Sequence, residues 1–248
     1  MGRELPILFN TDMVCAILDE RKTATRRICR DGNDYSVPDM QFFDAEKRTY
    51  AVHNYADKEH RESVSIAERT CPVCPDDILY VRETWAFQGC IECMYQSEDE
   101  SCMLGKMSTI HEDKDAESEG CYIYRAGHPN PERIVWRPSI HMPKAAARIW
   151  LRVTYVTAER LQNMTLDDFL DEGVVLRPEA FNDPENAYWQ ARDIFRGIWD
   201  STIPKAKQQE YGWDANPLVW AIKFERCEKP AAGRRQNHGL RENINEIS

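Results

Sequence analysis

A short run near the N-terminus combines cationic and hydroxyl side chains, because residues 21–27 read Arg-Lys-Thr-Ala-Thr-Arg-Arg. The cations Arg21, Lys22, Arg26 and Arg27 could hold phosphate groups, and an arginine can do so with two hydrogen bonds. Since the chain has a formal net charge of -10, this local cluster indicates phosphate, nucleotide or nucleic acid as a partner. The alternative is a charged helix end followed by a solvated loop.

Two Cys-x-x-Cys pairs form a second group that could do chemistry. Cys71 and Cys74 are followed, after 15 residues, by Cys90 and Cys93. This spacing lies in the range for a four-thiolate zinc site, whose role would be structural because no coordination position stays open for water. The possible substitute ligands are Cys102 and Cys121. The alternative is a set of free, partly buried thiols.

The segments around the cationic run predict a helix and a strand that would hold it in place. A short apolar run at residues 6–9 suits a buried strand. An amphipathic helix follows the candidate caps Asn10 and Thr11 and ends near Arg21. Its apolar stripe consists of Met13, Val14, Ile17 and Leu18.

Further along the chain, strands alternate with separate helices. We expect strands at residues 78–85, 121–125, 148–155 and 218–225, and one hairpin around Tyr50 to His53. A helix should begin at the capping box of Thr165, and a longer one at Asp183. The apolar stripe of the longer helix would be Ala187, Tyr188, Ala191, Ile194, Phe195, Ile198 and Trp199. This order favours an α+β protein or a small barrel over a βαβ array.

Length and composition limit the classes of protein to consider. A chain of 248 residues, 42% of them hydrophobic, can bury one sizeable core. We expect a single domain over residues 1–227, with a polar, acidic insertion at about 86–120 and a polar tail at 228–248. The absence of a long apolar run or an export signal, together with an odd number of nine cysteines, predicts a cytoplasmic protein without a membrane partner.

Several segments together resemble the ASCH domain proteins of the PUA-like superfamily, in particular the larger versions found in phages and prophages. They occur in the family's order, from the first strand to about Arg226, at residues 6–9, 21–27, 77–85, 136–143, 159–161, 171–173 and 212–217. The resemblance implies a β-barrel with flanking helices. It also implies a cleft in which residues 21–27 face a nucleic acid or nucleotide.

Four further residues are candidates for contacts with that ligand. Trp85 could stack on a base, although tryptophans in strands are more often core residues. Arg82 and Glu83 belong to the same matching segment, and an inward-facing Glu83 should be either paired with an arginine or functional. His141 could contact the ligand, although a lone histidine is more often a packing residue.

Some small members of the resembling family are amidohydrolases that remove an acyl group from the exocyclic amine of a modified cytidine. The resemblance places their lysine, threonine and glutamate on Lys22, Thr25 and Glu172. In this interpretation Lys22, with a lowered pKa, deprotonates Thr25 Oγ1, which attacks the amide carbonyl, and Glu172 assists proton transfer.

The sequence therefore predicts binding of RNA, DNA or a modified nucleotide in a basic cleft, with amidohydrolysis as the alternative. A nuclease is less well supported because the sequence has no clear cluster of metal-binding carboxylates. A third possibility is a phage factor that blocks a host enzyme through its acidic surface. Apart from structural zinc, no cofactor is expected.

Overall fold

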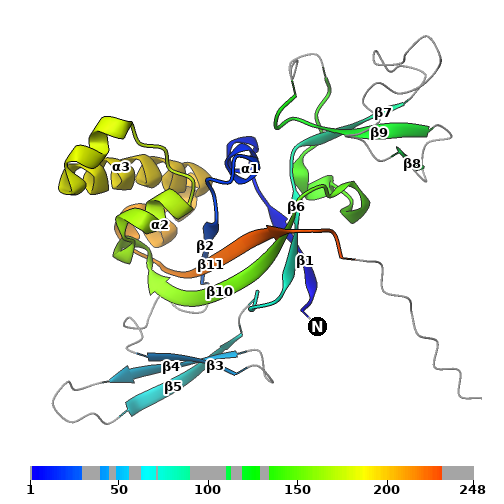
Figure 1. Ribbon diagram of the computed structural model, residues 1–248. Coiled ribbons are helices and arrows are strands. Elements are labelled where there is room, and N and C mark those ends of the chain that lie inside the picture. Colours follow the sequence, from blue (N-terminus) through cyan, green and yellow to red (C-terminus); the bar gives the residue numbers. More distant parts are fainter. Residues whose placement is uncertain are drawn as a thin grey trace, which may run out of the picture.

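The computed structural model (Figure 1) shows an α+β protein, in agreement with the sequence. The described residues are 2–29, 40–44, 49–55, 63–70, 72–89, 110–112, 119–128 and 134–230. Side chains are described in residues 2–29, 72–87, 122–128 and 134–230. The expected tail therefore lies outside the described residues from residue 231 onward.

A mixed five-stranded sheet forms the centre of the protein, with the strand order β1-β6-β10-β11-β2. β1 pairs with β6 in parallel, and the other neighbours are antiparallel. β1 and β2 are the two edges, so the described strands form an open sheet and do not close into the expected β-barrel. The five strands are β1 (Glu4–Leu8), β6 (Ile78–Arg82), β10 (Trp150–Arg160), β11 (Leu218–Cys227) and β2 (Ala24–Ile28).

A side chain nevertheless connects the two edges of this sheet. Arg27 on β2 donates a hydrogen bond from Nη2 to the carbonyl of Leu8 at the end of β1, at 2.9 Å. The backbone N–H of Phe9 donates to the carbonyl of Arg82 on β6 at 3.2 Å. The end of β1 is therefore the place where β2 and β6 approach each other.

The helices begin at the caps that the sequence predicts. Asn10 caps α1 (Thr11–Leu18), and Thr165 and Asp168 form a reciprocal capping box on α2 (Leu166–Asp171). Asp183 caps α3 (Pro184–Thr202). None of the helices in the described part of the chain is long and apolar enough to cross a membrane. The remaining helical segments are α4 (Gln208–Tyr211) and the 3-10 turns Ser139–His141, Lys144–Ala146, Leu161–Asn163, Pro178–Asn182, Lys205–Lys207 and Trp213–Ala215.

Two small antiparallel sheets accompany the central one. The expected hairpin region forms β4 (Thr49–Tyr55), which lies between β3 (Met40–Asp44) and β5 (Ser63–Thr70). The expected insertion at about 86–120 contains most of the second sheet, which consists of β7 (Trp85–Gly89), β9 (Glu119–Tyr124) and β8 (Ile110–Glu112) in that order. The strand expected at 78–85 is interrupted at Glu83 and Thr84.

Two details of the core differ from the sequence pattern. β10 carries a bulge between Val153 and Tyr155, so Val156 is buried and Tyr155 points outward, against the expected common face of Val153 and Tyr155. The bulge inserts one extra residue and reverses the alternation of side chains. On α3, Ile194 and Ile198 of the expected apolar stripe are exposed.

Glu20, which follows α1, has a positive φ of 62°. A side chain strains this left-handed conformation by about 1–2 kcal/mol, which glycine avoids. Because glycine also loses more chain entropy on folding, we expect Glu20→Gly to raise the free energy of unfolding by only about 0.5 kcal/mol. Urea denaturation measures this change, and Glu20→Ala is the control that keeps the strain. An equal gain in both variants would contradict the explanation.

Candidate functional site

Lys22, two residues before β2, and Glu172, at the end of α2, form a buried ion pair. Lys22 Nζ lies 2.5 Å from Glu172 Oε2 and also donates to the backbone carbonyl of Glu172 at 3.0 Å. The side chain of Lys22 is 0% exposed and that of Glu172 is 5% exposed. A single antiparallel bridge joins the two backbones. The structure thus brings together two of the three residues that the resemblance assigned to catalysis.

Thr25, the third residue, lies on β2, one position before Arg26 and two positions before Arg27. It is 2% exposed and pairs with Ile222 of β11. Because side chains alternate along a strand, Thr25 shares its face of β2 with Arg27. Arg27 and Lys22 both face the ring of Phe9, with Arg27 Cζ 5.2 Å and Lys22 Nζ 5.7 Å from its centroid. Lys22 and Arg27 therefore both reach Phe9 at the end of β1, while Thr25 lies on the Arg27 face of β2.

Arg26 points to the other face of β2 and contacts three carboxylates. Its Nη2 lies 3.0 Å from Glu159 on β10 and 2.8 Å from Asp168 on α2, and its Nη1 lies 3.5 Å from Glu172 Oε1. The side chain is only 1% exposed. Arg26 is therefore enclosed by protein carboxylates, which leaves no guanidinium surface for the phosphate that the sequence predicted as its ligand.

Burial and the charges of neighbouring groups shift the pKa values of these side chains in opposite directions. Burial lowers the pKa of Lys22 despite the attraction of Glu172, and the positive charges of Arg27 and Arg26 lower it further. Burial also raises the pKa of Glu159, although Arg26 opposes this shift. For Asp168, hydrogen bonds from Thr165 and Arg26 outweigh desolvation and lower the pKa. Asp168 is consequently a permanent negative charge beside Arg26 near neutral pH.

The turn at residues 171–173 holds Glu172 against Lys22 through contacts that lie nearer the surface. Thr23 donates hydrogen bonds from its backbone N–H to the carbonyl of Asp171 and from its Oγ1 to Asp171 Oδ1, while Asp171 Oδ2 lies 3.0 Å from Lys223 Nζ. Arg21 donates to the carbonyl of Gly173 at 3.2 Å. Gly173 has φ +93°, and a Cβ at this position would lie 3.3 Å from Lys22 Cβ. The close approach of the two segments thus depends on a glycine.

The other predicted ligand residues form a second group beyond the end of β6. Glu83 is buried and receives two hydrogen bonds of 2.9 Å from Arg148, which confirms the expected arginine partner. Arg82 donates to the carbonyls of Met142 and Ile140. Trp85 is a core residue beneath the guanidinium of Arg137, whose Cζ is 5.0 Å from a Trp85 ring centroid.

His141 is the one exposed member of this second group. It lies in the 3-10 turn next to Met142, and its backbone N–H donates to Pro138. The second group approaches the first at the end of β1, where Leu8 pairs with Arg82 and accepts a hydrogen bond from Arg27. Of this group, Glu83 and Trp85 are buried by the protein itself, so they are not positioned to contact a ligand directly.

The Glu83–Arg148 pair should make stability depend on pH. Burial raises the pKa of Glu83, while Arg148 opposes the shift. Above the ordinary glutamate pKa, Glu83 keeps its proton longer in the folded protein than in the unfolded chain. The free energy of unfolding therefore decreases as the pH rises through the pKa that Glu83 has in the folded protein. Arg148→Met removes the charge that opposes this shift and leaves a buried carboxylate unpaired. We therefore expect the free energy of unfolding to fall by about 3 kcal/mol at pH 7, and by less at pH 5, where Glu83 is more readily protonated.

Urea denaturation of Arg148→Met at both pH values tests this expectation. The matched control is Arg152→Met, because Arg152 pairs with Glu225 in a bridge that is about half exposed on both sides and should change stability by less than about 1 kcal/mol. Equal losses for Arg148→Met at the two pH values would show that Glu83 is not the titrating group.

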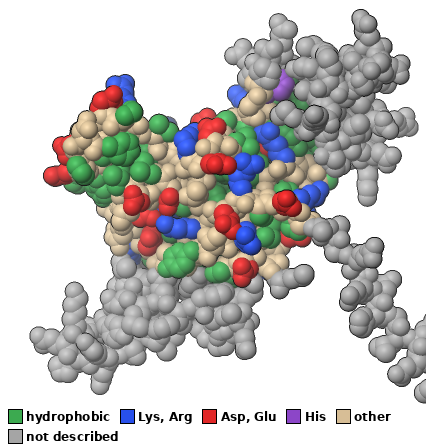
Figure 2. Space-filling model, in the orientation of Figure 1, with side chains coloured by type: hydrophobic (Ala, Val, Ile, Leu, Met, Phe, Trp, Pro, Cys, Tyr) green, Lys and Arg blue, Asp and Glu red, His purple; other side chains and the backbone are tan. Residues whose placement is uncertain are grey.

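Among the described residues, the side chains of Lys22, Thr25 and Glu172 are nearly inaccessible and do not open directly onto a pocket. A depression of about 400 Å³ is lined by residues that include Lys22, Thr23 and Arg226. Since the Lys22 side chain is 0% exposed, this depression reaches only its backbone. On the face shown in Figure 2, acidic and basic side chains are interspersed and do not form one continuous basic surface.

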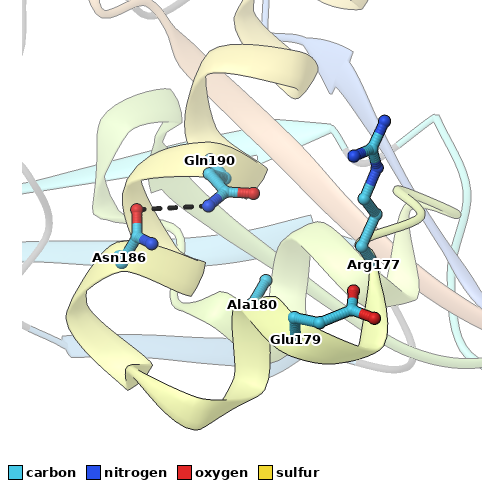
Figure 3. Close-up of a pocket in the computed structure, with 5 residues that line it drawn as sticks. All are labelled: Arg177, Glu179, Ala180, Asn186 and Gln190. Atoms are coloured by element: carbon cyan, nitrogen blue, oxygen red, sulfur yellow. Dashed lines mark hydrogen bonds between the residues drawn. The ribbon is translucent and has the colours of Figure 1, made fainter.

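A larger pocket of about 550 Å³ lies between the loop after α2 and the first turns of α3 (Figure 3). Its lining side chains are polar apart from Ala180, and Gln190 donates to Asn186 at 3.2 Å. The pocket is lined by Arg177, Glu179, Ala180, Asn186 and Gln190. None of these is a residue that the sequence singled out, so the pocket and the Lys22–Glu172 pair are different places.

Most of the predicted zinc ligands lie outside the described residues. Of the four, only Cys74 is described, and it is a fully buried member of the main hydrophobic cluster at the turn before β6. Gly89, the residue before Cys90, is the last residue of β7, which begins at Trp85. Within the described side chains, no group of three or more candidate ligands could hold a metal ion. The zinc site stays a prediction.

Sequence reasoning missed several residues that complete the site. The roles of Phe9, Arg148, Glu159 and Asp168 become visible only when distant segments meet. Glu159 and Asp168 lie 133 and 142 residues from Arg26 in the sequence. For Asp168, the sequence indicated a local role, because this residue occupies the third position of a capping box.

Comparisons with protein-family models, with curated proteins and with solved structures find no match for this chain. The geometry of the site is therefore the basis for assigning a function.

Proposed function

We propose that this chain is an ASCH-type protein of the PUA-like class that hydrolyses an amide on the exocyclic amine of a nucleoside or nucleotide, such as an N4-acylated cytidine. One observation carries the proposal. Lys22 and Glu172, 150 residues apart in sequence, meet at 2.5 Å in a buried pair, and Thr25 lies on β2, three residues after Lys22. A lysine, a threonine and a glutamate together can activate a nucleophile.

The reaction divides into two steps in this proposal. Neutral Lys22 takes the proton of Thr25 Oγ1, and the oxygen forms a bond to the amide carbon. The bond between that carbon and the exocyclic nitrogen then breaks, and the leaving amine takes the proton from Lys22. Water hydrolyses the resulting threonine ester, so one amide and one water give one carboxylic acid and one free amine.

Other charged groups of the site would assist these steps. The lowered pKa of Lys22 makes its neutral, basic form available at a lower pH than for an ordinary lysine. Arg27 is the cation on the Thr25 face of β2 and would stabilise negative charge on the carbonyl oxygen. Glu172 Oε1 is buried without a hydrogen-bond partner among the described residues, so it can accept a hydrogen bond from the substrate amine.

Substrate access requires a local movement, because the side chains of Lys22, Thr25 and Glu172 are all nearly inaccessible in this structure. The turn at residues 171–173 is the segment best suited to move. Its contacts to Arg21, Thr23 and Lys223 are polar and lie at or near the surface, and such contacts open at a smaller free-energy cost than core packing.

Binding of nucleic acid without turnover is the weaker candidate. This function needs several arginines that point into one groove, where they can bind the phosphates of the nucleic acid. Arg26 is buried among carboxylates, Arg27 contacts Leu8 and Phe9, and Arg21 lies 3.0 Å from Asp19. The positive charges of the run are therefore engaged by groups of the protein itself, which favours a small substrate over a long polyanion.

Incubation with a panel of N4-acylated cytidines tests the proposed function, with release of the carboxylic acid and of free cytidine measured by chromatography. We expect both products in equal amounts. The control substrates are the corresponding esters of the ribose hydroxyls, which lack the scissile amide. No release from any acylated cytidine, combined with salt-dependent binding of an oligonucleotide, would favour the binding function instead.

A further inference from the structure

Arg26 was expected to bind a ligand, but its surroundings suggest a different task. Its guanidinium is 1% exposed and contacts Glu159 and Asp168 at 3.0 and 2.8 Å. It also donates from Nη1 to the backbone carbonyl of Asp168 at 3.3 Å. A buried cation with this many protein partners is fixed in one orientation. It cannot also reach a substrate.

The same guanidinium acts on the proposed catalytic pair through Glu172. Arg26 Nη1 lies 3.5 Å from Glu172 Oε1, while Glu172 Oε2 lies 2.5 Å from Lys22 Nζ. Oε1 has no hydrogen-bond partner among the described residues, so Arg26 is the cation that faces it. The carboxylate of Glu172 is thus held between Arg26 on one side and Lys22 on the other.

We propose that Arg26 is a positioning residue, which orients the Glu172 carboxylate toward Lys22 and, with Asp168 and Glu159, sets the balance of charge at the lysine. The catalytic meaning of this network rests on the proposed function, but its electrostatic effect does not. The charged groups that face Lys22 are Glu172 from the end of α2 and Arg26 and Arg27 from β2, and Phe9 contributes its ring.

The network predicts shifts of opposite sign from two substitutions. Arg26→Gln removes a positive charge, so the pKa of Lys22 should rise by about one pH unit or more. Asp168→Asn removes a negative charge that partly neutralises Arg26, so the pKa of Lys22 should fall. A general loss of packing would not move one value up and the other down.

The titration of Lys22 can be followed by NMR of 13C-labelled lysine side chains, with the Lys22 signal assigned by its absence in Lys22→Met. The matched control for Asp168→Asn is Asp167→Asn, the adjacent and exposed aspartate of the same helical turn. The control for Arg26→Gln is Arg152→Gln, because Arg152 is about half exposed and pairs with Glu225, away from Lys22 and Glu172. Both controls should leave the pKa of Lys22 unchanged.

Opposite shifts in Arg26→Gln and Asp168→Asn, with unchanged controls, would support the positioning role. An unchanged pKa in both variants, or shifts in the same direction, would overturn it. If Arg26→Gln does not fold, a lowered pKa in Asp168→Asn but not in Asp167→Asn supports the role, and its absence overturns it. Because the readout is a titration, the network can be confirmed even if no acylated cytidine is hydrolysed.

Discussion

Replacing Thr25 by valine is expected to lower kcat/KM for amide hydrolysis by about a thousandfold or more, because valine has the shape of threonine without the nucleophilic oxygen. Thr25 lies on an edge strand and is 2% exposed, and a β-branched residue should keep the strand intact. Lys22→Met should cause a loss of similar size, because no other lysine contacts Glu172 among the described residues.

The kinetic test needs controls for folding and for the hydroxyl group. Thr25→Ser restores a hydroxyl at the same position and should recover most of the activity. Circular dichroism and urea denaturation show whether Thr25→Val retains the fold. If a folded Thr25→Val protein kept kcat/KM within tenfold of the wild type, the hydroxyl would not be the nucleophile.

Gly173→Ala is expected to destabilise the protein by about 2–3 kcal/mol and to remove most of the activity. The residue has φ +93°, which alone costs an alanine about 1–2 kcal/mol. The added Cβ would lie 3.1 Å from Ala16 Cβ and 3.3 Å from Lys22 Cβ, so either the turn or β2 must shift. Such a shift would move Glu172 away from Lys22.

Gly197→Ala is the matched control, because Gly197 lies within α3 and a Cβ there would meet no atom within 4 Å. At an exposed position in a helix, alanine is more stable than glycine by about 0.5–1 kcal/mol. The free energy of unfolding of this variant should therefore increase, and its activity should stay the same. Urea denaturation and kcat/KM compare the two glycines. Equal stability of Gly173→Ala and the wild type would contradict the assigned role of the turn.

The sequence predicted the features that depend on neighbouring residues. The caps Asn10, Thr165 and Asp183 lie within a few residues of the groups they satisfy, so a local pattern identifies them. An inward-facing Glu83 was expected to be either paired with an arginine or functional. The sequence could not name Arg148, which is 65 residues away and meets Glu83 only after the strands pair.

Features set by distant contacts were predicted incorrectly or not at all. The bulge in β10 arises in its pairing with β11, so the alternating pattern of residues 148–155 could not show that Tyr155 points outward. Likewise, the sequence pattern of residues 21–27 suggested an open cationic cleft. It could not reveal that Glu159, Asp168 and Glu172 converge on Arg26 and enclose it.

Mass spectrometry of the protein, quenched shortly after mixing with an N4-acylated cytidine, tests the proposed function most directly. The account predicts a transient species heavier by one acyl group, with the ester located on Thr25 by peptide mapping, and no such species in Thr25→Val. Turnover of the substrate without an acylated protein, or an acyl group on a different residue, would contradict Thr25 as the nucleophile and the function assigned to the Lys22–Glu172 pair.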